Sequence, residues 1–330
     1  LLPSVLFSEF LNVSAFKYIV FSLGIISIAF LSKYIGRLSK KDKYKILKYC
    51  LFINRTVLIL SIIILFIGLG FPRNETGFAG AFNHPQAFGV YLVFFNLIEL
   101  FVRRVGKENV QVSYIFLFTI IVCSYLTESR LSLITISLML ATYFYVFSEL
   151  NKLKKVLFTL LMCFIAFAFF EIIYTAISEV FSKRGRSDYT GIAALTASRG
   201  YFVLASIQNF LDNLLFGIGF QISNGKYGHF EMEVIYSQFF NFPIAASIEK
   251  GVFWSSLFEE TGLIGGIGFI WFLFTNTKAK TESFGLMCAL CMVMVGFGEA
   301  FLFSMGGLGF YVWFVYYITI NYRVSEFKYE

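Results

Sequence analysis

The sequence predicts an all-α protein, a polytopic bundle of transmembrane helices with a long extracytoplasmic loop. Three observations predict this class. The 330-residue chain is 58% hydrophobic and only 14% charged, whereas soluble domains are about 25% charged. Its apolar residues are gathered in runs about 20 residues long, the length that crosses a bilayer. Its Lys and Arg residues recur in alternate connections between those runs, as they do in cytoplasmic loops of membrane proteins.

The same composition excludes other classes of protein. A soluble chain of this size cannot bury so much apolar surface, and disordered chains are poor in aromatic residues, which make up 20% of this one. The net charge of +7 is not gathered in one patch, so no nucleic-acid partner is expected. Four of the five Cys lie inside apolar runs, and we interpret Cys288-x-x-Cys291 as helix packing rather than a redox pair.

We expect nine spans in the chain as given, and we expect residues 1–12 to form the tail of a preceding helix. These spans divide the chain into N-terminal transmembrane helices in 1–178, an extracytoplasmic loop in 179–251 and C-terminal transmembrane helices in 252–330. The predicted spans are 16–34, 51–71, 84–102, 111–128, 130–148, 156–178, 252–275, 283–303 and 308–322.

Basic residues set the predicted orientation. They are concentrated in 32–50 and then in every second connection, at Arg103, Arg104 and Lys107, at Lys152, Lys154 and Lys155, at Lys278 and Lys280, and at Arg323 and Lys328. The positive-inside rule makes that side cytoplasmic. The 179–251 loop then lies outside the cytoplasmic (inner) membrane. Within it, residues 200–216 have the spacing of an amphipathic helix at the membrane surface, which Gly217-Ile218-Gly219 ends.

Cations on the predicted outer side are the candidates for chemistry, because the positive-inside rule disfavours them. An Arg there either anchors a helix at the lipid headgroups or binds an anion. Arg suits the pyrophosphate of a lipid carrier, since its planar fork binds phosphate oxygens in pairs. For Arg130 the alternative is a local pair with Glu128. For Lys183, Arg184 and Arg186 we favour a solvated loop.

No motif for a metal or a nucleotide cofactor is visible. The chain has three Asp without an Asp-x-Asp pair, two His, no Gly-x-x-x-x-Gly-Lys loop and no Gly-x-Ser-x-Gly. We therefore expect no cofactor, no metal site and a reaction that does not need a divalent metal.

Four short segments on the predicted outer side carry characteristic residues. In 73–91, Arg73 is followed by Gly80-Ala81-Phe82 and His84-Pro85-Gln86 at the start of a span. The others are Thr127-Glu128-Ser129-Arg130-Leu131-Ser132, Ser198-Arg199 followed by Leu215–Phe220, and Leu257–Gly265. In this order they resemble motifs of the bacterial O-antigen polymerases and ligases, and they cover 73–275. Ligases of that superfamily carry a His-Asn pair shortly before the last motif, where this chain has Glu249-Lys250-Gly251-Val252, so the resemblance favours the polymerases of Wzy type.

The resemblance implies a glycosyltransferase that moves a glycan from polyprenyl pyrophosphate onto another lipid-linked repeat unit, with a protein that regulates chain length as a further partner. Arg199 and Arg130 are the expected pyrophosphate ligands, and Glu249 is the first candidate for the catalytic base. The expected substrate-binding residues are Arg73, His84, Lys250 and Tyr201. Weaker candidates are Glu128 and His229 as base, and Tyr227, Phe230 and Trp254 as sugar-binding aromatics, for which packing is the more common role.

Three alternatives stay open. One is an O-antigen ligase of the same superfamily. Another is a transporter or flippase for a lipid-linked or anionic solute, indicated by Glu171 and Glu299 within predicted spans. The one-sided loop and the absence of internal repeats count against it. A scaffold or channel is the third hypothesis.

Overall fold

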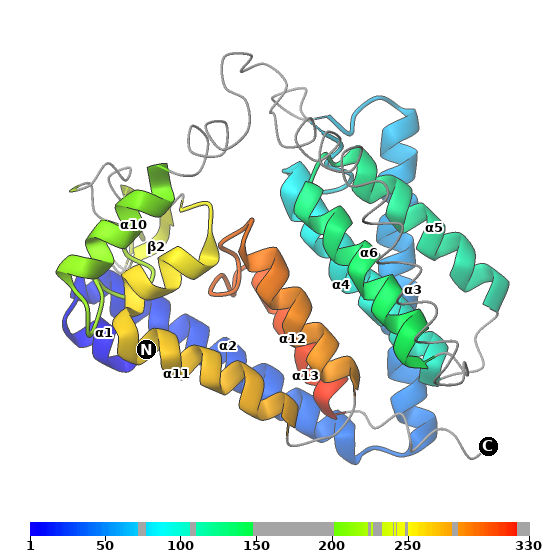
Figure 1. The fold of residues 1–330 in the computed structure, drawn as a ribbon, viewed down its shortest axis with the longest axis horizontal. Coiled ribbons are helices and arrows are strands. Elements are labelled where there is room, and N and C mark those ends of the chain that lie inside the picture. Colours follow the sequence, from blue (N-terminus) through cyan, green and yellow to red (C-terminus); the bar gives the residue numbers. More distant parts are fainter. Residues whose placement is uncertain are drawn as a thin grey trace, which may run out of the picture.

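The structure of the chain is a computed structural model, and the part that it describes is mostly helical (Figure 1). The described residues are 1–71, 77–105, 110–147, 201–223, 226, 233–239, 241, 243–247, 250–278 and 283–321. The helices are α1 (Leu2–Leu6), α2 (Leu11–Arg37), α3 (Lys40–Phe66), α4 (Pro85–Val105), α5 (Val110–Leu126), α6 (Arg130–Phe147), α10 (Tyr201–Asp212), α11 (Phe253–Lys278), α12 (Ser283–Gly296) and α13 (Leu308–Asn321). The strands of this part are β1 (Glu233–Tyr236) and β2 (Pro243–Ser247).

Four of these helices are long and apolar enough to cross a membrane, namely α2, α3, α4 and most of α11. The shorter helices α5, α6, α12 and α13 are also apolar. Each of the eight overlaps a predicted span, but α3 begins eleven residues before its predicted span 51–71 and α12 ends seven residues before the end of 283–303. The remaining predicted span, 156–178, lies outside the described residues, so the count of nine spans stays a prediction.

The helices form two groups joined by a central pair. In Figure 1, α3, α4, α5 and α6 stand together on one side, and α1, α2, α10 and α11 on the other. Between them, α13 packs against both α2 and α4, while α12 packs against both α11 and α6. The described connections lie at two ends of the helices. The α2–α3 connection is on the lower side of Figure 1, and the α5–α6 and α12–α13 connections are on the upper side.

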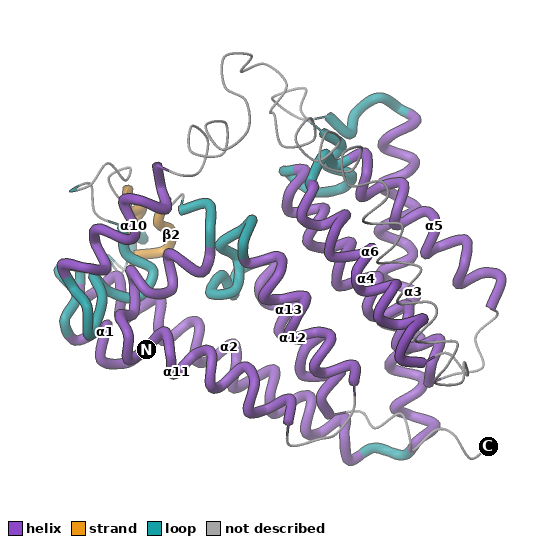
Figure 2. Tube along the Cα trace, viewed as in Figure 1, coloured by secondary structure: helices purple, strands orange, loops and turns teal. Residues whose placement is uncertain are grey.

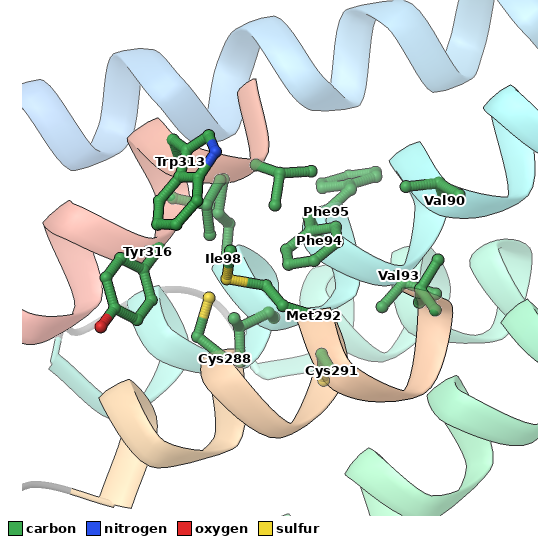
Figure 3. Packing of buried hydrophobic residues seen from close by; sticks show 14 of the residues in the cluster. Val90, Val93, Phe94, Phe95, Ile98, Cys288, Cys291, Met292, Trp313 and Tyr316 are labelled. Carbon is green, nitrogen blue, oxygen red and sulfur yellow. The ribbon is translucent and has the colours of Figure 1, made fainter. Parts of the chain in front are cut away.

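Helix α4 lies at the centre of its group, because 89% of its most apolar stretch is buried, against 22% for the corresponding stretch of α3. The exposed faces of α2 and α3 are apolar and include Phe30, Phe52 and Phe66, as expected of lipid-facing helices. The core between α4, α12 and α13 contains Cys288 and Cys291 beside Ile98 and Met292 (Figure 3). Both cysteines are buried and free, which confirms the prediction of helix packing.

The sequence analysis did not foresee a two-stranded sheet within the predicted 179–251 loop (Figure 2). Strands β1 and β2 are antiparallel, with Val234 opposite Ala246 and Ile235 opposite Ala245. The predicted amphipathic helix over 200–216 is present as α10, which ends at Asp212.

A second difference concerns the predicted span 252–275, which is not one continuous helix. Gly262 interrupts α11 with φ 63° and ψ −170°. A Cβ atom on Gly262 would lie 2.3 Å from the Leu215 carbonyl oxygen. Glycine is therefore required here both for its positive φ and for the close approach of the 214–219 segment.

We predict that Gly262→Ala lowers stability by about 1–3 kcal/mol from backbone strain alone, with the clash against Leu215 adding to it. Thermal unfolding of the purified protein in detergent measures the change. Gly268→Ala is the matched control, because Gly268 lies in the same helix and has nothing within 4 Å of its Cβ position. Equal midpoints for the two variants would show that the break does not depend on glycine.

Candidate functional site

The break in α11 frees backbone groups that the neighbouring segment satisfies. The carbonyls of Glu259 and Glu260 accept hydrogen bonds from the N–H groups of Ile218 (2.9 Å) and Gly219 (3.2 Å). Beyond Gly262, the N–H of Leu263 donates to the Leu214 carbonyl at 2.9 Å. Non-helical backbone inside an apolar span is tolerated where protein buries it or where it lines a site. Residues 214–219 therefore replace the missing turn of α11.

Three charged side chains meet beside this break. The Nζ atom of Lys250 lies 3.2 Å from Glu259 Oε2 and 3.2 Å from Glu260 Oε1, and it also donates to the carbonyl of Ile222. The Lys250 and Glu259 side chains are 2% and 0% exposed. We refer to Lys250, Glu259 and Glu260 as the ion cluster.

Neutral donors complete the ion cluster, which has two carboxyl groups for one ammonium. From α10, Ser206 Oγ donates to Glu259 Oε2 at 2.9 Å and Asn209 Nδ2 donates to Glu259 Oε1 at 2.7 Å. The Gln221 N–H donates to Glu260 Oε2 at 2.9 Å. These bonds tie α10, α11 and the 214–223 segment into one unit.

Electrostatics keeps the ammonium of the ion cluster charged. Burial lowers the pKa of Lys250, but the carboxylates of Glu259 and Glu260 raise it by more, so the pKa lies above the ordinary value for lysine. In the ion cluster, the Lys250 ammonium is held by carboxylate and carbonyl oxygens of the protein. This arrangement is suited to positioning the chain around it.

A second assembly joins two of the family-like segments. The N–H of Phe78 donates to the Leu126 carbonyl at 2.8 Å, and a Cβ atom on Gly77 would lie 2.3 Å from the Thr127 carbonyl oxygen. A Cβ atom on Gly89 would lie 2.8 Å from the Ser129 Cβ. Residues 77–91 and the hairpin 127–132 are therefore packed directly against each other.

Arg130 is the first residue of α6 and is half-buried. Ser129 precedes it as the N-cap, with its carbonyl accepting from the Leu133 N–H at 3.1 Å and its Oγ 2.8 Å from Ser132 Oγ. Glu128 is exposed and has a positive φ of 54°. Arg130 therefore stands at a helix N-terminus, where backbone N–H groups and the helix dipole favour an anion.

His84 is exposed at the start of α4. Its Nδ1 accepts a hydrogen bond from the Gln86 N–H at 3.2 Å, and Pro85 follows as the first helical residue. This contact is a helix cap, a local role that the sequence analysis did not consider for His84.

An ion pair that was not predicted from the sequence lies within the helices. Arg55 of α3 donates to both carboxylate oxygens of Glu99 of α4, at 2.6 Å from Nη2 and 3.2 Å from Nε. The Arg55 guanidinium also lies 4.6 Å from the centre of the Phe116 ring. Both charges fall inside predicted spans, and an ionisable residue within a span is a signal in itself.

The structure places the other predicted residues as follows. Glu299 lies in the connection after α12, which ends at Gly296, and not within a helix as predicted. Trp254 donates from Nε1 to the Val293 carbonyl at 2.9 Å, which is a packing contact. Tyr201 begins α10, and its side chain is not described. The residues that lie outside the described part of the chain are Arg73, Glu171, Arg199, Tyr227, His229, Phe230 and Glu249.

Comparisons with known proteins identified no relative of this chain. No protein-family model matches the chain, and neither a curated protein nor a solved structure matches it.

We predict that Lys250→Met destabilises the protein by about 3–5 kcal/mol, because it leaves two buried carboxyl groups without their cation. Thermal unfolding in detergent is the measurement. Adding Glu259→Gln and Glu260→Gln to Lys250→Met removes the uncompensated charges and should recover part of the loss. A single variant as stable as the wild type would contradict the role of the ion cluster.

Proposed function

We propose that this chain is a polysaccharide polymerase of the cytoplasmic membrane. It transfers a glycan from polyprenyl pyrophosphate to a lipid-linked repeat unit at the outer face, with the 179–251 loop on that side. Nine spans, metal independence and a regulator of chain length belong to the same proposal. The proposal rests on the family-like segments of the sequence.

One structural observation supports it. The described parts of the four segments, far apart in the sequence, pack as two assemblies. Residues 77–91 meet 127–132, and the Leu215–Phe220 segment meets Leu257–Gly265. Both assemblies lie away from the α2–α3 connection (Figure 1), whose basic residues are cytoplasmic in the predicted topology. Residues that form one site must share one side of the membrane.

The chemistry requires a stabilised leaving group. The bond between the anomeric carbon of the donor glycan and the pyrophosphate oxygen breaks, and the anomeric carbon bonds to the acceptor hydroxyl oxygen. Lipid pyrophosphate leaves with the bonding electrons. We assign Arg130, with the α6 N-terminus, and Arg199 to the growing negative charge. Glu249 is proposed to accept the hydroxyl proton.

The residues proposed to bind substrate are those predicted from the sequence, except Lys250. Arg73, His84 and Tyr201 remain candidates for contact with the lipid-linked glycans. Lys250 is bound by Glu259 and Glu260, so we assign it a positioning role next to Glu249 in the sequence.

A second candidate function is transport of a lipid-linked or anionic solute. The broken helix α11 favours it, because interrupted helices form substrate sites in many transporters, and so does the Arg55–Glu99 pair within the helices. Purified protein in detergent, supplied with a lipid-linked repeat unit, distinguishes the two. A ladder of polymer supports an enzyme, because detergent has no compartments, and a single addition to a different lipid acceptor supports the ligase alternative.

We predict that Arg130→Ala and Arg199→Ala each lower polymer formation by roughly 10²–10³-fold, the usual effect of losing one preorganised donor to developing charge. Arg→Lys should rescue only partly, because Lys lacks the paired fork. Polymer is measured at matched membrane expression. Arg184→Ala, in the stretch interpreted as solvated loop, is the control. Near-normal polymer from a Lys variant would remove that Arg from the site, because an anchor at the headgroups needs only a long cationic side chain.

We also predict that polymer formation persists in the presence of a chelator. The charge on the leaving group is assigned to Arg side chains, so removal of divalent ions should leave the ladder unchanged. Loss of product that returns on addition of magnesium or manganese would contradict this assignment.

A further inference from the structure

Helix α10 turns polar side chains toward the protein and apolar side chains outward, although Ala205 is also buried. Its buried face carries Ser206 and Asn209, which bond to Glu259 of the ion cluster. Its outer face carries Leu204, Ile207 and Leu211, which are 58%, 43% and 63% exposed. A helix on a soluble surface turns its apolar stripe inward. Water is therefore not the natural surrounding of this outer face.

The apolar surface continues beyond the helix. Leu214 and Leu215 are exposed, and the next residue, Phe216, stacks on Phe7 with 4.3 Å between ring centres. Phe7 is itself exposed, so the apolar surface of α10 extends onto the residues that follow α1. We refer to Leu204, Ile207, Leu211, Leu214 and Leu215 as the leucine face.

The leucine face borders a helix that is long enough to cross a membrane. The Leu263 and Ile264 N–H groups bond to the carbonyls of Leu214 (2.9 Å) and Leu215 (3.3 Å). From that point, α11 exposes Ile264, Ile267 and Trp271, at the spacing of one helix face. The leucine face is thus joined by backbone hydrogen bonds to a lipid-type face of α11.

A third side of α10 is polar. Gln208 and Asp212 are exposed, and Asp212 Oδ2 lies 2.5 Å from Nζ of Lys226, which is also exposed. The helix therefore has a buried face, an exposed apolar face and an exposed polar edge. Helices that lie in the membrane interface combine an exposed apolar face with a polar one in this way.

We infer that the leucine face of α10 is covered by acyl chains of the bilayer, with Gln208 and Asp212 at the aqueous edge. The sequence predicts a helix at the membrane surface, and the structure identifies which side chains enter the lipid. The inference does not depend on the proposed enzymatic function. It places the ion cluster behind a helix that separates its carboxyl groups from lipid.

Nitroxide labels at single cysteines test the inference. The five native Cys are replaced by Ala, and Ile207→Cys, Leu211→Cys and Gln208→Cys are labelled in turn. The protein is reconstituted in phosphatidylcholine and phosphatidylglycerol vesicles, and collision rates with oxygen and with a water-soluble nickel chelate are measured. Oxygen dissolves in acyl chains and the chelate does not. We expect high oxygen and low nickel accessibility at 207 and 211, and a shift toward nickel at 208.

Two results would overturn the inference. Ready access of the nickel chelate to 211 would show that the face is in water, and low access of both reagents would show that protein covers it. Should the Cys-free protein fail to fold, Leu211→Trp and Gln208→Trp in the wild-type chain provide a second measurement. Brominated lipids should then quench the added fluorescence at 211 more than at 208, and equal quenching would count against lipid contact.

Discussion

The rest of this structure depends on one constraint: an apolar helix interrupted at Gly262 must find partners for its freed backbone groups. In a bilayer, water cannot supply them. The 214–219 segment does so through backbone bonds to Glu259, Glu260 and the residues after the break. Because that segment follows α10 directly, α10 is held against α11.

The Arg55–Glu99 pair and the ion cluster differ in how their charges are balanced. Arg55 and Glu99 balance one charge with one, through two hydrogen bonds and an aromatic ring, and they fix α3 against α4. In the ion cluster, one ammonium serves two carboxyl groups, so Ser206, Asn209 and the Gln221 N–H are needed as well. Removal of one partner from a buried pair leaves an uncompensated charge. Both arrangements therefore restrict how the helices that carry them can be placed.

The helix positions could be predicted because the length of an apolar run is a direct consequence of bilayer thickness. The break at Gly262 could not, because a glycine within an apolar run is compatible with a continuous helix, and only the approach of Leu215 makes it a break. The strand pair formed by β1 and β2 was missed for a similar reason, since each strand is only four or five residues long. Arg55 was visible in the sequence. It was overlooked because the positive-inside rule directs attention to connections rather than to spans.

Helix α10 shows how the same amphipathic pattern can be read in two ways. Periodicity alone identifies an apolar side and a polar side, but not which of them faces the protein. The residue packed against α10 determines which side faces inward. Because the Glu259 carboxylate requires hydrogen-bond donors, Ser206 and Asn209 face the protein, and the leucines are exposed. If the leucines lie in lipid, the polar edge of α10 is at the level of the headgroups. The pyrophosphate of a lipid-linked glycan occupies the same level. Under the proposed function, a site built beside such a helix would meet its substrate without drawing the polyprenyl chain out of the membrane.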